Sequence, residues 1–323
     1  MSDKKIKIVF LGTPEFAVAS LDILVKNNYE IAGVVTAPDK RAGRGQDLHQ
    51  SPVKKYALEH SLKLFQPENL KDTFFEDELR LLQAELFIVV AFRMLPESVW
   101  KMPVLGTFNL HASLLPKYRG AAPINRAIIN GETETGLTTF KLKQQIDTGN
   151  VLFQEKVNID ALDNAGTLHN KLMIKGAQLI LKSVEEIEME FNGFKKIVFT
   201  EQNNSEASHA LKIFKENCKI NWNNSVVEIH NLVRGLSPYP GAYCDISISG
   251  NKCKVLKIFV SRFEIVSHTN PNGLHLSDGV NYLKIYGVDG YLEIIELQLE
   301  GKKRMQVKEF LKGFKLTETM KFL

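Results

Sequence analysis

Residues 6–36, IKIVFLGTPEFAVASLDILVKNNYEIAGVVT, decide the fold of this chain. The apolar run Ile6–Leu11 predicts a buried strand, and the Gly-Thr-Pro-Glu sequence after it opens a helix that ends near Asn27. Thr13 is placed to cap this helix, which brings the chain back to a second strand at Tyr29–Thr36. A strand, a helix and a strand in this order indicate a parallel sheet with right-handed crossovers.

The turn after the first strand excludes the most familiar use of such a sheet. Gly12 stands alone where a dinucleotide-binding loop needs three glycines in the pattern GxGxxG. A nicotinamide-dependent dehydrogenase therefore loses its main support. The remaining first half continues the alternation of strands and helices, with helices expected at 52–60, 74–82, 123–130 and 164–191 and strands at 63–65, 86–91, 107–111, 136–143 and 151–157.

The pattern changes beyond residue 191. Residues 192–209 contain EQNNSEASH and have the composition of a linker, and residues 210–323 predict five short strands and a closing helix at 306–313. Five strands in about 110 residues are typical of a small barrel of the oligonucleotide-binding (OB) type. The predicted architecture is an α/β Rossmann-like catalytic domain over 1–191, a linker over 192–209 and an OB-like barrel domain over 210–323.

Composition and charge narrow the functional classes. With 323 residues, 44% of them hydrophobic, the chain has the composition of a globular protein, and no apolar run reaches the roughly 18 residues of a membrane span. Three scattered cysteines without a CxxC pair indicate reduced thiols in a cytoplasmic protein. Residues 210–323 hold 16 Lys and Arg against 11 Asp and Glu, whereas residues 1–209 hold 25 against 26. This asymmetry permits a polyanionic partner on the second domain.

Residues 108–123, FNLHASLLPKYRGAAP, hold the first candidate site. Asn109 and His111 lie at the end of a predicted strand, where alternation projects them to one face and Phe108 and Leu110 to the other. An amide and an imidazole side by side at a strand end suit a site, although a polar sheet edge explains them equally well. Asp147 lies in the turn QIDTGN, whose Asp-Thr-Gly sequence is also ordinary turn chemistry.

The polar loop 37–51, APDKRAGRGQDLHQS, is a second candidate. It carries Lys40, Arg41 and Arg44, and it follows a parallel strand on the side where open α/β sheets bind ligands. A basic loop there suits an anionic ligand, and an ordinary surface loop is the alternative.

Three motifs give the chain a family resemblance: NLHASLLP at 109–116, YRGAAP at 118–123 and QIDTG at 145–149. GTP at 12–14, RAGRG at 41–45, SPVK at 51–54 and FQP at 65–67 support it. The chain resembles the folate-dependent formyltransferases over nearly all of its length. Its RAGRG loop and C-terminal domain together are similar to the branch that acts on charged initiator tRNA.

The resemblance implies a reaction and a set of site residues. The reaction is transfer of the formyl group of 10-formyltetrahydrofolate to the free amino group of methionyl initiator tRNA, without a metal. The implied catalytic trio is Asn109, His111 and Asp147, and the implied folate-contacting segment is Ser113, Leu114, Leu115 and Pro116. The implied tRNA-binding residues are Arg44 with Lys40 and Arg41. The chain departs from the family at Arg41, where Pro is usual, and at Phe92-Arg93, where many members have Tyr-Gly.

The chemistry of formyl transfer suits these residue types independently. A neutral amine attacks a carbonyl, so negative charge develops on oxygen and positive charge on the attacking nitrogen. The Asn109 amide and a His111 ring N–H can donate to that oxygen. Asp147, if it meets His111, would hold the imidazole ring and accept the proton leaving the amine. No serine or cysteine lies in a nucleophile motif, and the eight histidines show no metal-ligand spacing.

Two other functions remain open from the sequence. The same trio serves formyltransferases that act on an amino sugar nucleotide or on glycinamide ribonucleotide, so it does not discriminate between acceptors. A catalytically idle RNA-binding protein that uses the basic barrel is the third hypothesis, and the intact trio argues against it. We expect a monomer with no membrane association.

Overall fold

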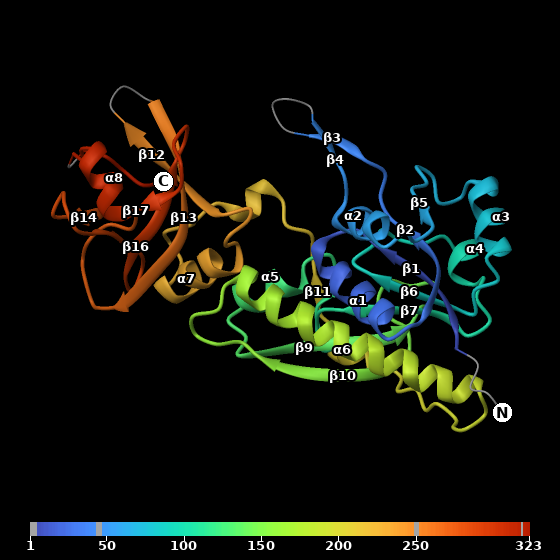
Figure 1. Cartoon of the computed structure of the whole chain (residues 1–323). Coiled ribbons are helices and arrows are strands. Elements are labelled where there is room, and N and C mark those ends of the chain that lie inside the picture. The colour runs from blue at the N-terminus through green and yellow to red at the C-terminus, as the bar shows by residue number, and fades with distance from the viewer. Residues whose placement is uncertain (1–4, 43–46, 249–251, 318) are drawn as a thin grey trace. The chain divides into compact units, whose positions relative to one another are not determined.

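The computed structural model of the chain describes residues 5–42, 47–248, 252–317 and 319–323 (Figure 1). The chain forms two compact units. The first comprises Met1–Gly120, Thr135–Val157 and His169–His209, and the second comprises Ala121–Glu134, Asn158–Leu168 and Ala210–Leu323. Two short segments of the expected catalytic domain therefore lie in the second unit. The division of function between 1–191 and 210–323 stays a prediction.

A seven-stranded sheet forms the centre of the first unit (Figure 1). Its order is β10-β9-β7-β6-β1-β2-β5, in which the strands from β7 to β5 run parallel and β9 runs antiparallel to β7. The bounds are β1 Lys7–Gly12, β2 Glu30–Val35, β5 Leu64–Phe65, β6 Leu86–Val90, β7 Gly106–His111, β9 Glu134–Lys141 and β10 Val151–Asn158. This sheet confirms the expected Rossmann-like architecture. The order reverses between β1 and β6, and open α/β sheets bind ligands at the carboxyl ends of strands flanking such a reversal.

Helices cover both faces of this sheet (Figure 1). On one face, α3 (Thr73–Leu81) and α4 (Glu97–Trp100) bury Phe75 and Val99 against Val9 and Leu11 of β1. On the other face lie α1 (Glu15–Lys26) and α6 (Ala165–Phe191), which meet through the rings of Phe16 and His169. The close approach of α6 to the sheet requires a small residue, because a Cβ on Gly176 would lie 2.8 Å from Cδ2 of Leu110.

The starts of two helices show how local sequence sets the fold. The expected cap by Thr13 is wrong: α1 begins at Glu15, so Pro14 occupies the N-cap position and offers no side-chain hydrogen bond. In α2 (Pro52–Glu59), by contrast, the Ser51 hydroxyl accepts a hydrogen bond from the Lys54 N–H at 3.0 Å. Ser51 therefore satisfies one of the unpaired N–H groups at the start of α2.

The second unit contains a coiled antiparallel sheet of order β12-β13-β16-β15-β14, with β17 on β16 (Figure 1). The bounds are β12 Ala242–Ile248, β13 Lys252–Ile265, β14 His275–Ser277, β15 Leu283–Tyr286, β16 Gly290–Leu299 and β17 Met305–Gln306. Leu256, Ile285 and Leu292 are fully buried in its core, which α8 (Val307–Gly313) covers through Phe310. This arrangement confirms the OB-like fold.

One helix of the second unit was absent from the sequence-based expectation. It is α7 (Val226–Gly235), which begins with a reciprocal cap between Ser225 and Glu228. It packs against α5 (Pro123–Ile129), and the Asn125 side chain donates to the Gly235 carbonyl at 2.7 Å.

The first unit also has a hairpin of β3 (Lys40–Ala42) and β4 (Asp47–His49) inside the expected loop 37–51.

Short elements complete the described chain. They are β8 Arg119–Gly120, β11 His209–Ala210 and the 3₁₀ helices η1 Asn204–Glu206 and η2 Lys215–Cys218. Within the described residues, no helix has the length and apolar character needed to span a bilayer.

Candidate active site

The end of β7 places two polar side chains at the carboxyl edge of the sheet. Phe108 and Leu110 are buried on the α6 side, and alternation turns Asn109 and His111 to the opposite face. Asn109 is half-buried, and within the described part of the chain its side-chain amide makes no hydrogen bond. Its donor is therefore available to a ligand. His111 is buried, with 7% of its surface exposed.

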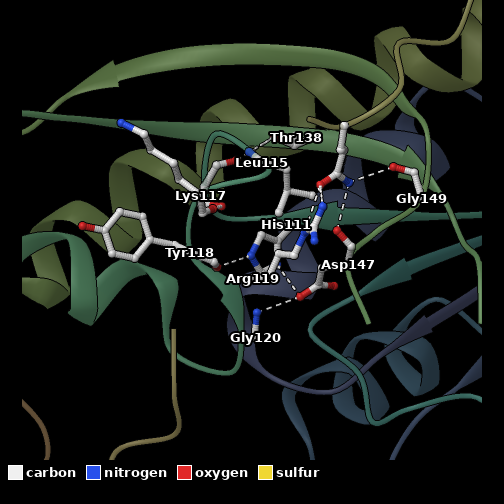
Figure 2. Close-up of polar contacts among 11 residues, drawn as sticks. His111, Leu115, Lys117, Tyr118, Arg119, Gly120, Thr138, Asp147 and Gly149 are labelled. Carbon is white, nitrogen blue, oxygen red and sulfur yellow. Dashed lines mark hydrogen bonds and ion pairs between the residues drawn. The ribbon is translucent and has the colours of Figure 1, made fainter. Parts of the chain in front are cut away.

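Both ring nitrogens of His111 have a defined neighbour (Figure 2). Nε2 lies 2.9 Å from the carbonyl oxygen of Tyr118, and because a carbonyl only accepts, Nε2 carries a proton and donates it. Nδ1 faces Oδ2 of Asp147 at 3.7 Å, which is longer than a hydrogen bond. The nitrogen beside the carboxylate is thus the one left for a reacting group.

Asp147 meets His111 from a turn between β9 and β10 (Figure 2). Its backbone is left-handed, with φ of 53°, and its carboxylate is 12% exposed. Oδ2 accepts a hydrogen bond from the Gly120 N–H at 2.8 Å, which fixes the carboxylate beside the imidazole. The sequence around Asp147 is that of an ordinary turn and does not by itself indicate a functional residue. The proximity of its carboxylate to His111 is what marks Asp147 as a candidate site residue.

Two residues that sequence reasoning did not single out support this turn, Gln202 by direct contact and Arg119 through Gln202. The side-chain amide of Gln202 donates to the carbonyl oxygens of Asp147 and Gly149, at 2.9 and 2.8 Å. The guanidinium of Arg119 donates to Oε1 of Gln202 from Nε at 3.1 Å and Nη2 at 2.7 Å. Gln202 lies in the predicted linker, where no local pattern marks it.

The segment Ser113–Pro116 forms a fixed wall next to His111. Ser113 is fully buried and donates its hydroxyl to the Lys117 carbonyl at 2.6 Å. Leu115 is 4% exposed, with its N–H donated to Thr138 and its carbonyl accepting from Gln154. Leu114 and Pro116 are half-buried. In this conformation Leu114 and Pro116 therefore present the surface of the segment that a ligand could reach.

The basic loop is described only in part. Arg44 and the side chain of Arg41 lie outside the described residues, whereas Lys40 is exposed in β3. At the root of the loop, Lys54 Nζ pairs with Oδ2 of Asp39 at 2.6 Å. The side chain of Lys54 is 14% exposed and that of Asp39 is 15% exposed.

Gln66 completes this root. Its side-chain amide donates to Oδ1 of Asp39 and to the carbonyl oxygen of Ala37, both at 2.9 Å. Hydrogen bonds from Lys54 and Gln66 lower the pKa of Asp39 below its usual value, so the carboxylate of Asp39 is charged at neutral pH. The SPVK and FQP motifs thus hold the two ends of the loop together.

Arg93 belongs to the Phe92-Arg93 pair at which the chain departs from the family. Its side chain has a structural role. Its guanidinium donates to the carbonyl oxygens of Pro67 and Glu68, the latter at 2.8 Å. Burial lowers the pKa of Arg93 from its ordinary value, but an arginine stays charged at neutral pH. Within the described residues, no group of three or more His, Cys, Asp or Glu side chains is placed to hold a metal ion.

Two family models match separate parts of the chain. Residues 5–184 match "Formyl transferase" and residues 212–315 match "Formyl transferase, C-terminal domain". The chain therefore belongs to the formyl transferase family.

Within that family, the chain is similar to proteins with one particular name. It is 50% identical over 323 residues to the methionyl-tRNA formyltransferase of Bacteroides thetaiotaomicron, covering 99% of each chain. It is 49% identical over 318 residues to that of Flavobacterium johnsoniae, covering 98% of this chain and 99% of the relative. A solved structure of WlaRD, a sugar 3N-formyl transferase in the presence of dTDP and 5-N-formyl-THF, matches with a TM-score of 0.64 and 25% identity over 93% of this chain and 100% of the other.

Proposed function

We propose that this protein transfers the formyl group of 10-formyltetrahydrofolate to the free amino group of methionyl initiator tRNA, giving formylmethionyl-tRNA for translation initiation. The observation that carries the proposal is identity of about 50% to methionyl-tRNA formyltransferases along 99% of the chain. The juxtaposition of His111 and Asp147 at the carboxyl edge of the sheet supports a formyl-transfer site in particular.

In the proposed mechanism, Asn109 and His111 stabilise charge on the formyl oxygen. As the amine attacks, that oxygen becomes negative, and donors already oriented toward it lower the barrier without reorganising. The Asn109 amide is available, and because Nε2 of the imidazole donates to the Tyr118 carbonyl, Nδ1 is the ring nitrogen left to face the reacting atoms. The Asp147 carboxylate, 3.7 Å from Nδ1, would stabilise positive charge on the ring when His111 donates from Nδ1 to the formyl oxygen.

Asp147 also manages the proton that the attacking amine must lose. Its Oδ2 is engaged by the Gly120 N–H, so we assign to Oδ1 the role of accepting this proton, directly or through water. The reaction then needs no covalent enzyme intermediate. The formyl carbon forms a bond to the amine nitrogen, and its bond to N10 of the folate breaks. N10 is released as N–H.

The carboxyl edge offers a suitable wall for the folate co-substrate. Leu114 and Pro116 present apolar surface beside His111, and Gln154 and Thr138 hold the backbone between them. We assign the formyl donor to this wall, with Ser113 and Leu115 supporting it from inside. Binding sites for such co-substrates are mostly apolar and largely pre-formed, as this segment is.

The tRNA acceptor is assigned to the basic loop and the basic C-terminal part. Lys40, Arg41 and Arg44 supply positive charge to the loop, and residues 210–323 carry five more basic than acidic side chains. Phosphate contacts of this kind give affinity that falls steeply with salt. The protein is proposed to act as a monomer in the cytoplasm, where its tRNA substrate is used.

The decisive assay supplies radiolabelled or mass-detected formyl donor and compares acceptors. Charged initiator tRNA should be formylated, whereas uncharged initiator tRNA and charged elongator tRNA should not. Activity only on an amino sugar nucleotide would replace the proposal with a sugar formyltransferase. Tight tRNA binding with no formylation of any acceptor would identify the idle RNA-binding alternative.

A further inference from the structure

Arg119 is an unusual residue to find beside this site. It is 9% exposed, and no carboxylate among the described residues pairs with its guanidinium. Its partners are the neutral oxygens of Gln202 and Asn204, at 2.7 and 2.9 Å from Nη2. A buried cation without a counter-charge is costly unless its hydrogen bonds are made, so these two amides are what stabilise it.

The arginine also fixes the direction in which Gln202 points. A guanidinium only donates, so the atom of Gln202 that faces Arg119 must be Oε1. The amide nitrogen is then directed to the opposite side, toward the carbonyl oxygens of Asp147 and Gly149. Flipping this amide would bring NH₂ against the guanidinium and a carbonyl against two carbonyls. Arg119 therefore excludes the flipped state.

The turn that Gln202 holds needs external support. Asp147 has φ of 53°, a left-handed conformation that costs a non-glycine residue about 1 kcal/mol or more. Gly149 allows the chain to pass close to β9, since a Cβ there would lie 1.7 Å from the Lys141 carbonyl oxygen. Such a conformation persists when surrounding contacts determine it. Gln202 bonds both ends of the Asp147–Gly149 segment.

The residues around Arg119 connect this support to both members of the site. Tyr118 accepts from His111 through its carbonyl, and Gly120 donates to Asp147 through its N–H. Between them, the Arg119 side chain reaches Gln202. One short stretch thus sets the imidazole, the carboxylate and the backbone beneath the carboxylate (Figure 2).

We propose that Arg119 and Gln202 are positioning residues for formyl transfer, which keep the Asp147 carboxylate facing His111. This inference rests on the proposed function, because it assigns Asp147 a part in the reaction. Arg119 and Gln202 do not themselves contact substrate. They act through the turn, and their loss should lower turnover rather than substrate affinity.

The primary test is Gln202→Ala, measured by steady-state formylation of charged initiator tRNA. A carboxylate displaced by about 1 Å can cost up to about 10²-fold, so kcat should fall by roughly 10- to 100-fold while KM for both substrates changes less than about twofold. Asn27→Ala is the matched control, because the Asn27 side-chain amide also donates to a backbone carbonyl, that of Ile23 at 2.7 Å, at the end of α1. It should keep the wild-type kcat.

Gln202→Glu separates positioning from folding. Glutamate keeps the side-chain length and pairs with Arg119, but it offers no donor to the Asp147 and Gly149 carbonyls. We expect a protein that unfolds within a few degrees of wild type and still loses kcat. Wild-type turnover in Gln202→Glu would overturn the proposal, and so would a loss of kcat that only accompanies unfolding.

A double variant shows whether the effect passes through Asp147. If it does, Asp147→Asn/Gln202→Ala should be no slower than Asp147→Asn alone, because the carboxylate that Gln202 positions is already gone. Multiplied losses would overturn the proposal. Failure of the proposed function looks different, because wild-type protein would then leave charged initiator tRNA unformylated.

Discussion

The turn that carries Asp147 and the hairpin that carries the basic loop are held in different ways. The turn is fixed at its functional residue, where Gly120 binds the carboxylate and Gln202 binds the backbone of Asp147. In the hairpin, the side-chain hydrogen bonds seen among described residues lie at the root, where Lys54 and Gln66 hold Asp39. The reaction slows when a reacting group is misplaced by about 1 Å. A cation, by contrast, attracts a phosphate over a Debye length of about 8 Å. The difference in support matches the difference in task.

The largest effect should come from the turn residue Asp147 and from the two polar residues of β7. Asn109→Ala, His111→Ala and Asp147→Ala should each lower kcat by about 10²–10³-fold, because each removes an interaction made in the transition state. KM for the folate and the tRNA should change little. Single-turnover formylation distinguishes a slower chemical step from slower product release. A change confined to KM would contradict the assigned roles.

The hairpin should respond in affinity instead of turnover. Arg44→Ala should raise KM for charged tRNA by about tenfold, the effect of one charge-assisted hydrogen bond, and leave kcat and folate KM near wild type. Lys71→Ala, which removes an exposed lysine before α3, is the matched control. Wild-type tRNA binding should weaken steeply as salt rises, with a shallower slope in Arg44→Ala. A loss of folate affinity would show that the loop belongs to the folate site.

The smallest effect should come from the root. Lys54→Met removes the partner of Asp39, so we expect a several-fold lower kcat/KM for charged tRNA and an unfolding temperature a few degrees lower. The lowered pKa of Asp39 sets the pH range of the stability difference. A carboxyl whose folded pKa is depressed stabilises the protein above its unfolded pKa of about 3.9 and loses that stabilisation as pH falls through the folded value.

Thermal unfolding of wild type and Lys54→Met at several pH values therefore tests the root. The difference between them should be constant from pH 8 to about pH 5 and shrink below about pH 4. A difference that disappears near pH 6 would indicate another titrating group.

The order of elements was predictable because apolar periodicity is local. Ile6–Leu11 and Leu86–Val90 are continuous apolar runs, and both form buried parallel strands. Asn109 and His111 share a face for the same reason. The helix α7 was missed because polar residues interrupt its short apolar pattern. Ser225 and Glu228 have the spacing of a capping box, which is a signal for the start of this helix.

The candidate site was only partly accessible to such reasoning. Asp147 has the sequence of an ordinary turn, and family resemblance rather than any local pattern connected it with His111. Arg119 and Gln202 are 83 residues apart, so nothing in the local sequence of either implies their hydrogen bonds. Contacts of this range depend on how the sheet, the turn and the returning chain are assembled.

The segment after α6 has a consequence for how the protein can be divided. Phe199 stacks on Phe108, Thr200 bridges to Val151, and Ser208 binds the backbone of Tyr118 and Arg119. A linker without contacts could be cut anywhere along its length, but this stretch packs on β7 and β10 and binds the backbone next to the candidate site. We therefore expect a minimal catalytic fragment to extend through His209, because cleavage after Phe191 would remove these contacts together with Gln202.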